Sequence, residues 1–155
     1  MTIQNPYYYG SAENKLNSKG QVVMPARFRS VLSEEDANWN YVITRGEESC
    51  LYVYTHRQFE KIKDNVKGVA LETGDSEFYR RFMAEACAVD IDTQGRFVLP
   101  PSLMKAVAIT GPTILFIGMD DRLEIWEPSI YSKARIEDSR YEETRRNAAR
   151  RIFGI

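Results

Sequence analysis

Residues 17–25 read NSKGQVVMP and residues 92–100 read DTQGRFVLP, and this pair of segments decides the fold class. In both segments a short polar residue stands three positions before a glycine, which is followed by one polar residue, three apolar residues and a proline. The two glycines, Gly20 and Gly95, are 75 positions apart (95 − 20). Self-similarity at a fixed offset indicates that one supersecondary unit occurs twice.

The similarity continues downstream of both segments. The same order of elements is predicted in residues 41–54 (YVITRGEESCLYVY) and in residues 113–126 (TILFIGMDDRLEIW). Each segment predicts an apolar strand, a turn at Gly46 or Gly118, and an alternating strand. A helical pattern follows each of them. Between the copies, Asp75 or Ser76 can cap a helix that we expect to pack across both of them. We therefore divide the chain into a first repeat, connecting helices, a second repeat and a C-terminal helix: residues 7–57, 58–86, 87–129 and 130–155.

The repeated segment predicts a tight hairpin turn that leads into a strand. Asn17 and Asp92 can accept hydrogen bonds from backbone N–H groups two residues on, and Gly20 and Gly95 stand where a positive φ is often required. The apolar runs 22–24 and 97–99 predict strands that are buried on both faces. The prolines that follow can end these strands and begin short helices, which we expect in residues 26–32 and 102–108.

One unit of this size rarely buries enough apolar surface alone. Two copies that share strands would solve this problem, so the expected fold is mainly β with flanking α-helices, an interleaved β-barrel built from two tandem pseudo-repeats. The chain has 155 residues, 43% of them hydrophobic, which is sufficient for a packed core.

Composition restricts the classes of function. The formal net charge is −1, so nucleic-acid binding would depend on local cationic patches or on repetition in an oligomer. Cys50, Cys87 and His56 offer too few ligands for a zinc site, and the two cysteines favour a reduced, intracellular setting. We expect no metal, no cofactor, no signal peptide and no membrane span.

Basic residues near the two turns are the candidate functional groups. In one interpretation Lys15, Lys19, Arg27, Arg29, Arg96 and Lys105 are solvated surface charges. In the other, paired strand tips enter the DNA major groove, where Arg and Lys can recognise guanine edges. The arginine-rich segment 135–153 is likewise either a solvated helix or a contact for DNA or a partner. Asp90 and Asp92 resemble a catalytic carboxylate pair, but Asp92 has a turn role and no second acidic motif converges on it, so we expect no enzyme.

The pattern D-x-x-G-R-x-x-x-P followed by a short helix resembles the MraZ family of SpoVT-AbrB-type transcription factors over about residues 7–140. The resemblance implies a double-split, swapped-hairpin β-barrel whose subunits assemble into a homo-oligomeric ring. It also implies a cytoplasmic, nucleoid-associated regulator that binds repeated elements in double-stranded promoter DNA, commonly of its own division and cell-wall gene cluster. Neither a membrane nor a small-molecule substrate is implied.

The first copy departs from the family pattern, because Asn17 and Gln21 replace the aspartate and arginine that the second copy keeps as Asp92 and Arg96. Gln21 cannot supply a cation, although glutamine can hydrogen-bond an adenine edge. The candidate DNA-binding residues are Lys15, Lys19, Gln21, Arg27, Arg29 and Arg96. An alternative function is a protein-interaction or antitoxin-like module on the same barrel, with the C-terminal helix and the tyrosines at positions 7–9 as its docking surface.

Overall fold

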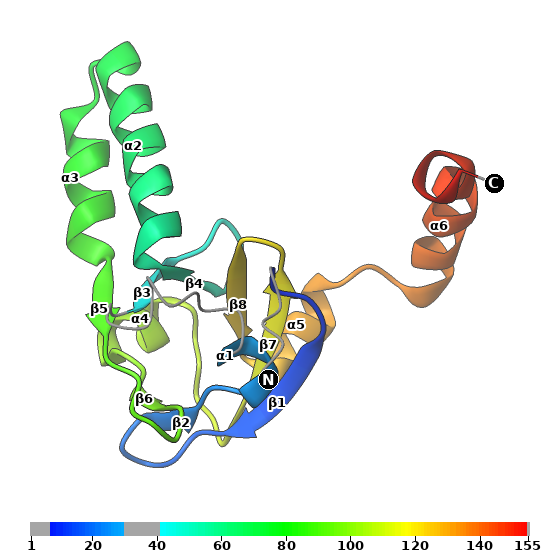
Figure 1. Ribbon diagram of the computed structural model, residues 1–155, viewed down its shortest axis with the longest axis horizontal. Helices are drawn as coiled ribbons and strands as arrows, with labels where there is room; N and C mark the ends of the chain where they lie inside the picture. Colours follow the sequence, from blue (N-terminus) through cyan, green and yellow to red (C-terminus); the bar gives the residue numbers. More distant parts are fainter. Residues whose placement is uncertain (1–6, 30–40, 155) are drawn as a thin grey trace, which may run out of the picture.

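The computed structural model describes residues 7–29 and 41–154 (Figure 1). Its main feature is an antiparallel sheet of six strands. In spatial order these are β1 (Ser11–Lys15), β7 (Thr113–Met119), β8 (Arg122–Trp126), β4 (Leu51–Thr55), β3 (Tyr41–Arg45) and β5 (Cys87–Val89). Two further strands, β2 (Gln21–Val23) and β6 (Arg96–Val98), pair with each other in a separate antiparallel ribbon. The fold is mainly β with flanking helices, as the sequence predicts.

Strands from the two copies alternate in these sheets. First-copy strands β1, β3 and β4 pair with β7, β5 and β8 of the second copy, and β2 pairs with β6. The strand sharing expected from the small size of one unit is therefore present. Strand pairing among the described residues leaves β1 and β5 at the ends of the sheet, so the closed, swapped-hairpin barrel stays a prediction.

The prediction that each repeated turn closes a hairpin was wrong. The first turn joins β1 to β2 and the second joins β5 to β6, but the strands on either side of each turn belong to different sheets. Each short strand instead pairs with its counterpart from the other copy, because two such strands can together cover the core that one could not.

The prediction that the strands after the turns are buried on both faces was also wrong. Val22 and Phe97 are opposite each other and point inward, with exposed fractions of 2% each. Val23 and Val98 point outward and are 40% and 50% exposed. Successive side chains of a strand alternate between faces. Because the ribbon lies at the lower edge of the molecule in Figure 1, only one of its faces meets the core.

Short helices follow both strands of the ribbon and bury one apolar residue each. Helix α1 (Ala26–Arg29) buries Phe28, and α4 (Pro101–Ala106) buries Leu103. The predicted end of the first helix, at residues 30–32, lies outside the described residues. In α4, Pro100 is the N-cap and Pro101 begins the helix, since the fixed φ of proline suits these positions. These side chains join a core formed by Met24, Ile43, Leu99, Ile114, Phe116 and Ile125.

Helices α2 (His56–Thr73) and α3 (Ser76–Glu85) form an antiparallel pair at the end of the molecule opposite the ribbon (Figure 1). Asp75 caps α3 by accepting a hydrogen bond from the backbone N–H of Phe78, one of the two caps expected. Phe82 stacks on Phe59 of α2 with ring centroids 6.2 Å apart. The cluster around these rings contains Val42 and Tyr54 of the first copy, so α3 does not pack across both copies as predicted.

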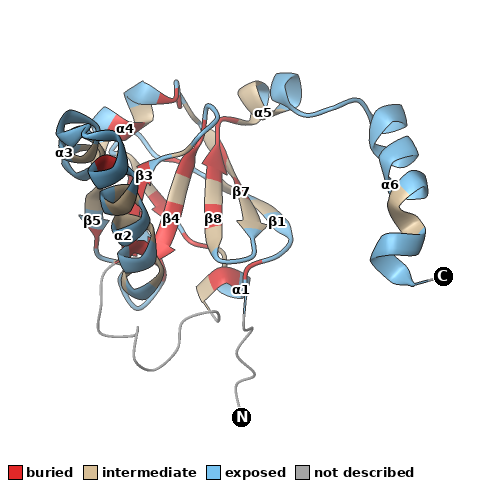
Figure 2. Cartoon of the chain, turned by 90° about the horizontal axis from the view of Figure 1, so that it is seen from above, coloured by how far each residue is buried: buried red, intermediate tan, exposed pale blue. Residues whose placement is uncertain are grey.

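The chain ends in α5 (Pro128–Ala134) and α6 (Asp138–Phe153). No residue of α6 is buried, and Figure 2 shows the helix apart from the body of the molecule. Gly118 lies inside β7 and not at the predicted turn. The backbone of Tyr9 passes so close to it that a Cβ there would lie 2.4 Å from the Tyr9 nitrogen, so this position needs a glycine. Among the described residues, no helix has the length and apolarity needed to span a bilayer.

Candidate nucleic-acid interface

The two repeated turns have the same hydrogen-bond geometry. The Asn17 Oδ1 atom accepts from the backbone N–H groups of Lys19 and Gln21, both at 2.9 Å. The Asp92 Oδ1 atom accepts from those of Gln94 and Arg96, also at 2.9 Å. Gly20 and Gly95 have φ values of 77° and 84°, which L side chains rarely adopt. A short side chain with an acceptor oxygen and a glycine three residues later therefore build both turns.

The same polar side chain also orients the residue after each glycine. In the second copy the Arg96 Nε atom lies 2.7 Å from the Asp92 Oδ2 atom. Hydrogen bonds from the backbone and side chain of Arg96 hold the pKa of Asp92 below its usual value. In the first copy the Asn17 Nδ2 atom donates to the Gln21 Oε1 atom at 3.3 Å. The two copies thus differ in both members of the pair, because two amides in the first copy replace the ion pair of the second in the same arrangement.

The charges near the turns are distributed unequally between the copies. Residues 15–21 contain Lys15 and Lys19 and no acidic residue, whereas residues 90–96 contain Asp90, Asp92 and Arg96. At the offset of 75, the two lysines correspond to Asp90 and Gln94. The copy that lacks the turn arginine is therefore the more cationic one. A surface that combines both copies has the guanidinium of Arg96, oriented by Asp92, and the exposed ammonium groups of Lys15 and Lys19.

The antiparallel ribbon brings the two turns together. The backbone N–H of Met24 donates to the Gly95 carbonyl at 2.8 Å, and that of Leu99 donates to the Gly20 carbonyl at 2.9 Å. A shallow hollow of about 310 Å³ beside the ribbon is lined by Lys15, Leu16, Asn17, Gln21, Val22, Val23, Arg96 and Pro112. Three of the candidate residues, Lys15, Gln21 and Arg96, thus meet at one place, although they come from both copies.

The other candidates do not line this hollow. Lys19 is exposed in the first turn, and Lys105 is exposed in α4. The Arg27 Nη1 atom donates to the Ser11 carbonyl at 3.3 Å. The Arg29 guanidinium lies 2.9 Å from the point where a Cβ on Gly95 would stand, so this first-copy arginine covers the second-copy turn. Arg27 and Arg29 therefore pack against backbone, which their sequence positions did not indicate.

The residues that sequence reasoning missed are Val23 and Val98. Both are exposed on the outward face of the ribbon, which also presents Gln21 and Arg96. The sequence has no polar residue at these positions to mark an outward face, since each lies in an apolar run of three. The alternation of buried and exposed side chains along these strands can be recognised only once it is known that the ribbon covers the core with one face.

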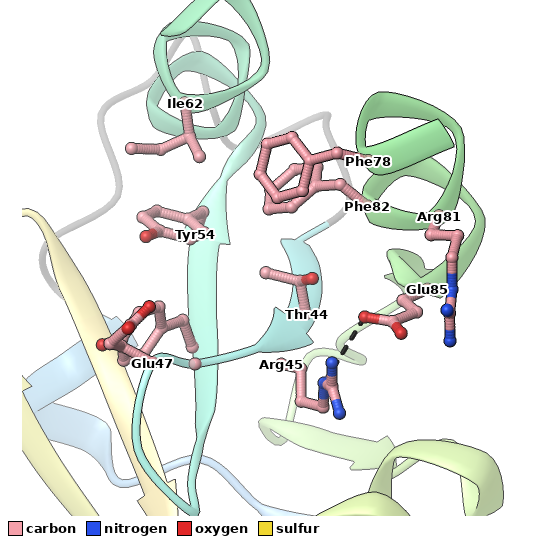
Figure 3. A pocket seen from close by; sticks show the side chains of 11 residues that line it. Thr44, Arg45, Glu47, Tyr54, Ile62, Phe78, Arg81, Phe82 and Glu85 are labelled. Carbon is pink, nitrogen blue, oxygen red and sulfur yellow. Dashed lines mark ion pairs between the residues drawn. The ribbon is translucent and has the colours of Figure 1, made fainter. Parts of the chain in front are cut away.

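A second hollow lies between the α2–α3 pair and strands β3 and β4 (Figure 3). Its volume is about 460 Å³, and Tyr54, Ile62, Phe78 and Phe82 form its apolar wall. At its edge the Arg45 Nε atom lies 3.4 Å from the Glu85 Oε2 atom. Further charged residues of the lining are Glu47 and Arg81. Balanced charges around an aromatic wall suit an apolar side chain of a partner protein better than a phosphate.

The cysteines and carboxylates offer little further chemistry. Within residues 7–29 and 41–154, no group of three or more His, Cys, Asp and Glu side chains is placed to hold a metal ion. Both cysteines are free. Burial raises the pKa of Cys50 to about 12, so this thiol is protonated at neutral pH and is a poor nucleophile.

Comparison with known proteins covers both copies. The family model described as "MraZ protein, putative antitoxin-like" matches residues 8–81 and again residues 82–153. A protein of Cytophaga hutchinsonii named transcriptional regulator MraZ is 37% identical over 134 residues, which are 86% of this chain and 87% of the relative. Proteins of the same name from Caldanaerobacter subterraneus subsp. tengcongensis and Paenarthrobacter aurescens are 33% and 31% identical. These two matches cover 86% and 81% of this chain, and 91% and 85% of the relatives.

Proposed function

This chain belongs to the MraZ family, and we propose that it is a transcriptional regulator that binds double-stranded DNA in a sequence-specific manner. The observation that supports the proposal most directly is the hollow beside the β2–β6 ribbon, where Lys15, Gln21 and Arg96 from both copies meet. A two-stranded ribbon fits the major groove, and these side-chain types recognise base edges and phosphates. The name of the relatives, transcriptional regulator, agrees with this role.

The proposed contacts follow from the geometry of the turns. Asp92 engages the Nε atom of Arg96 and thereby orients the guanidinium, whose terminal nitrogens can bond the O6 and N7 atoms of guanine. Gln21, held by Asn17, would contact an adenine edge. Lys15 and Lys19 would neutralise phosphates and fix the register. We place Arg27 and Arg29 behind this surface as supports, because their guanidinium groups lie against the backbone at Ser11 and Gly95.

We further propose that several copies assemble into a homo-oligomeric ring on repeated promoter elements of the chain's own division and cell-wall gene cluster. The net charge of −1 gives one copy little general affinity for DNA, whereas matched repeats add contacts through effective concentration. Helix α6 has no buried residue and lies far from the α2–α3 hollow of its own chain (Figure 1). Within residues 7–29 and 41–154 nothing else of the chain covers these two surfaces, and their separation suits head-to-tail association.

A binding measurement tests the proposal. The DNA upstream of the chain's own coding sequence and a scrambled fragment of equal length and composition are titrated at several salt concentrations. We expect preference for the upstream fragment and an affinity that falls as salt rises. Mass measurement with and without this DNA checks the oligomer. Equal binding of both fragments, independent of salt, would refute the proposal.

A protein-interaction or antitoxin-like module is the second candidate function. It is supported by the α2–α3 hollow, where Phe78 is 44% exposed beside balanced charges, and by the description of the family model. Affinity capture with the wild-type chain and with Phe78→Asp would separate the two functions. A stoichiometric protein partner that Phe78→Asp releases, combined with no DNA preference, would favour this candidate.

A further inference from the structure

We propose that Val23 and Val98 contact thymine methyl groups in the major groove and so help to determine which DNA sequence the β2–β6 ribbon binds. This inference rests on the DNA-binding function proposed above. It starts from the two outward-facing valines, which are 40% and 50% exposed although their neighbours in the same strands are buried. Because β2 and β6 are paired, the two exposed valines share one outward face of the ribbon and do not contribute to the core.

The register places each valine beside a polar residue that can contact a base. Val98 is directly opposite Gln21, and Val23 is directly opposite Arg96. Directly opposed side chains of an antiparallel pair have Cβ atoms about 4.5–5.5 Å apart. The outward face therefore consists of two equivalent pairs, each with one hydrogen-bonding side chain and one aliphatic side chain.

The chemistry of the major groove identifies what an aliphatic side chain would contact there. Hydrogen-bond donors and acceptors line the groove, and the C5-methyl group of thymine is the apolar group that its base pairs present. Successive base pairs are about 3.4 Å apart along the duplex. A side chain about 5 Å from Gln21 or Arg96 is thus within reach of the same or the next base pair. A valine at that place favours thymine, because thymine alone among the four bases presents a methyl group there.

The charges around the ribbon favour DNA over a second copy of the same ribbon as the occupant. Lys15 and Arg96 line the hollow next to Val23, and Lys19 is exposed in the adjoining turn. Self-association of this face would bring the like charges of two copies together, which is unfavourable. A phosphate-lined groove neutralises the same charges. The Asn14 side chain also donates to the Val23 carbonyl, so that the strand is held in place by β1.

Uracil-containing DNA gives a direct test, because uracil keeps every hydrogen-bonding edge of thymine and lacks only the C5-methyl group. The upstream fragment and its scrambled counterpart are each amplified with dTTP or with dUTP, and all four probes are titrated by fluorescence anisotropy. Burial of one methyl-sized group corresponds to about a fourfold change in affinity, and two contacts to about 15-fold. We expect wild-type affinity for the upstream fragment to fall by this factor with dUTP, while the scrambled fragment changes little.

Variants of the protein remove the valine methyl groups, so that their effect can be compared with removal of the thymine methyl groups from the DNA. The double variant Val23→Ala/Val98→Ala should bind the thymine form of the upstream fragment as weakly as wild type binds the uracil form, and should lose most of the difference between the two forms. Val69→Ala is the matched control, since Val69 is 49% exposed on α2 at the other end of the molecule. It should retain the full wild-type difference. Thermal melting of all variants verifies that they fold.

The outcomes separate the inference from the function on which it rests. Equal wild-type affinity for the thymine and uracil forms, with preference over scrambled DNA retained, would overturn the valine contacts and leave the DNA-binding function intact. A difference that persists undiminished in the double variant would also overturn them, since other residues would then sense the methyl groups. No preference for the upstream fragment in either form would refute the proposed function itself.

Discussion

Phe97 and Val98 are adjacent in the chain but face opposite sides of the ribbon, which makes them a sensitive test of the fold. Phe97 is 2% exposed and belongs to the main core cluster, so Phe97→Ala should cost about 3–5 kcal/mol through lost burial and the remaining cavity. Val98 is 50% exposed. Val98→Ala removes two carbon groups worth about 0.8 kcal/mol each when fully buried, so at half exposure it should cost no more than about 0.8 kcal/mol.

The assay is thermal and urea unfolding followed by circular dichroism at two protein concentrations. For a chain of this size each kcal/mol shifts the melting temperature by about 2–4 °C. We therefore expect Phe97→Ala to lower it by about 6–20 °C and Val98→Ala by no more than about 3 °C. Comparable losses for both variants would refute the one-sided burial of the ribbon. A large loss for Val98→Ala only at the higher concentration would instead show that another copy covers this face.

Three further predictions concern single side chains. Arg96→Gln gives the second copy the residue that the first copy has. It should weaken binding to the upstream fragment by about 10-fold or more, as expected for a lost bidentate base contact, with little change in melting temperature. Unchanged affinity would show that Arg96 is not part of the interface. Asp92→Asn should lower the melting temperature near neutral pH but not in acid. Because the pKa of Asp92 is lower in the folded chain, its carboxylate stabilises the fold fully above the ordinary aspartate pKa of about 3.9, and this stabilisation is lost as pH falls below the pKa in the folded chain. A difference in melting temperature that persists in acid would contradict this. Cys50, whose pKa burial raises to about 12, should react with iodoacetamide only in denaturant, as mass spectrometry of digested protein can show, and rapid labelling of the native chain would contradict its burial.

Duplication is what made the fold predictable from the sequence. Two segments with the same positions for a polar residue, a glycine and a proline predicted two copies, shared strands and a mainly β fold, and the pairing of β2 with β6 agrees with this. Strand pairing between copies was not predictable in detail, because the turns suggested local hairpins. A turn constrains only the residues within it, whereas the choice of partner strand depends on which apolar faces must be covered.

The candidate site could be predicted only in part, since the sequence identifies residue types but not their directions. Lys15, Gln21 and Arg96 were candidates and line one hollow. Arg27 and Arg29 were candidates because of charge alone, and their contacts with the backbone at Ser11 and Gly95 depend on how α1 follows the ribbon. An arginine that supports a turn and an arginine that faces DNA look alike in sequence.

The paired replacement of Asp and Arg by Asn17 and Gln21 changes what duplication means for function. Had the first copy lost only the arginine, an unpaired aspartate would repel phosphates at the centre of the proposed interface. With both replaced, the turn keeps its hydrogen bonds at 2.9 Å and the local surface stays neutral, while Lys15 and Lys19 add positive charge beside it. The two copies can then differ in the base that they recognise without any change in the ribbon that presents them. A site that recognises two unlike bases can bind DNA in one orientation only. Two identical copies related by a two-fold axis would bind equally well in both orientations.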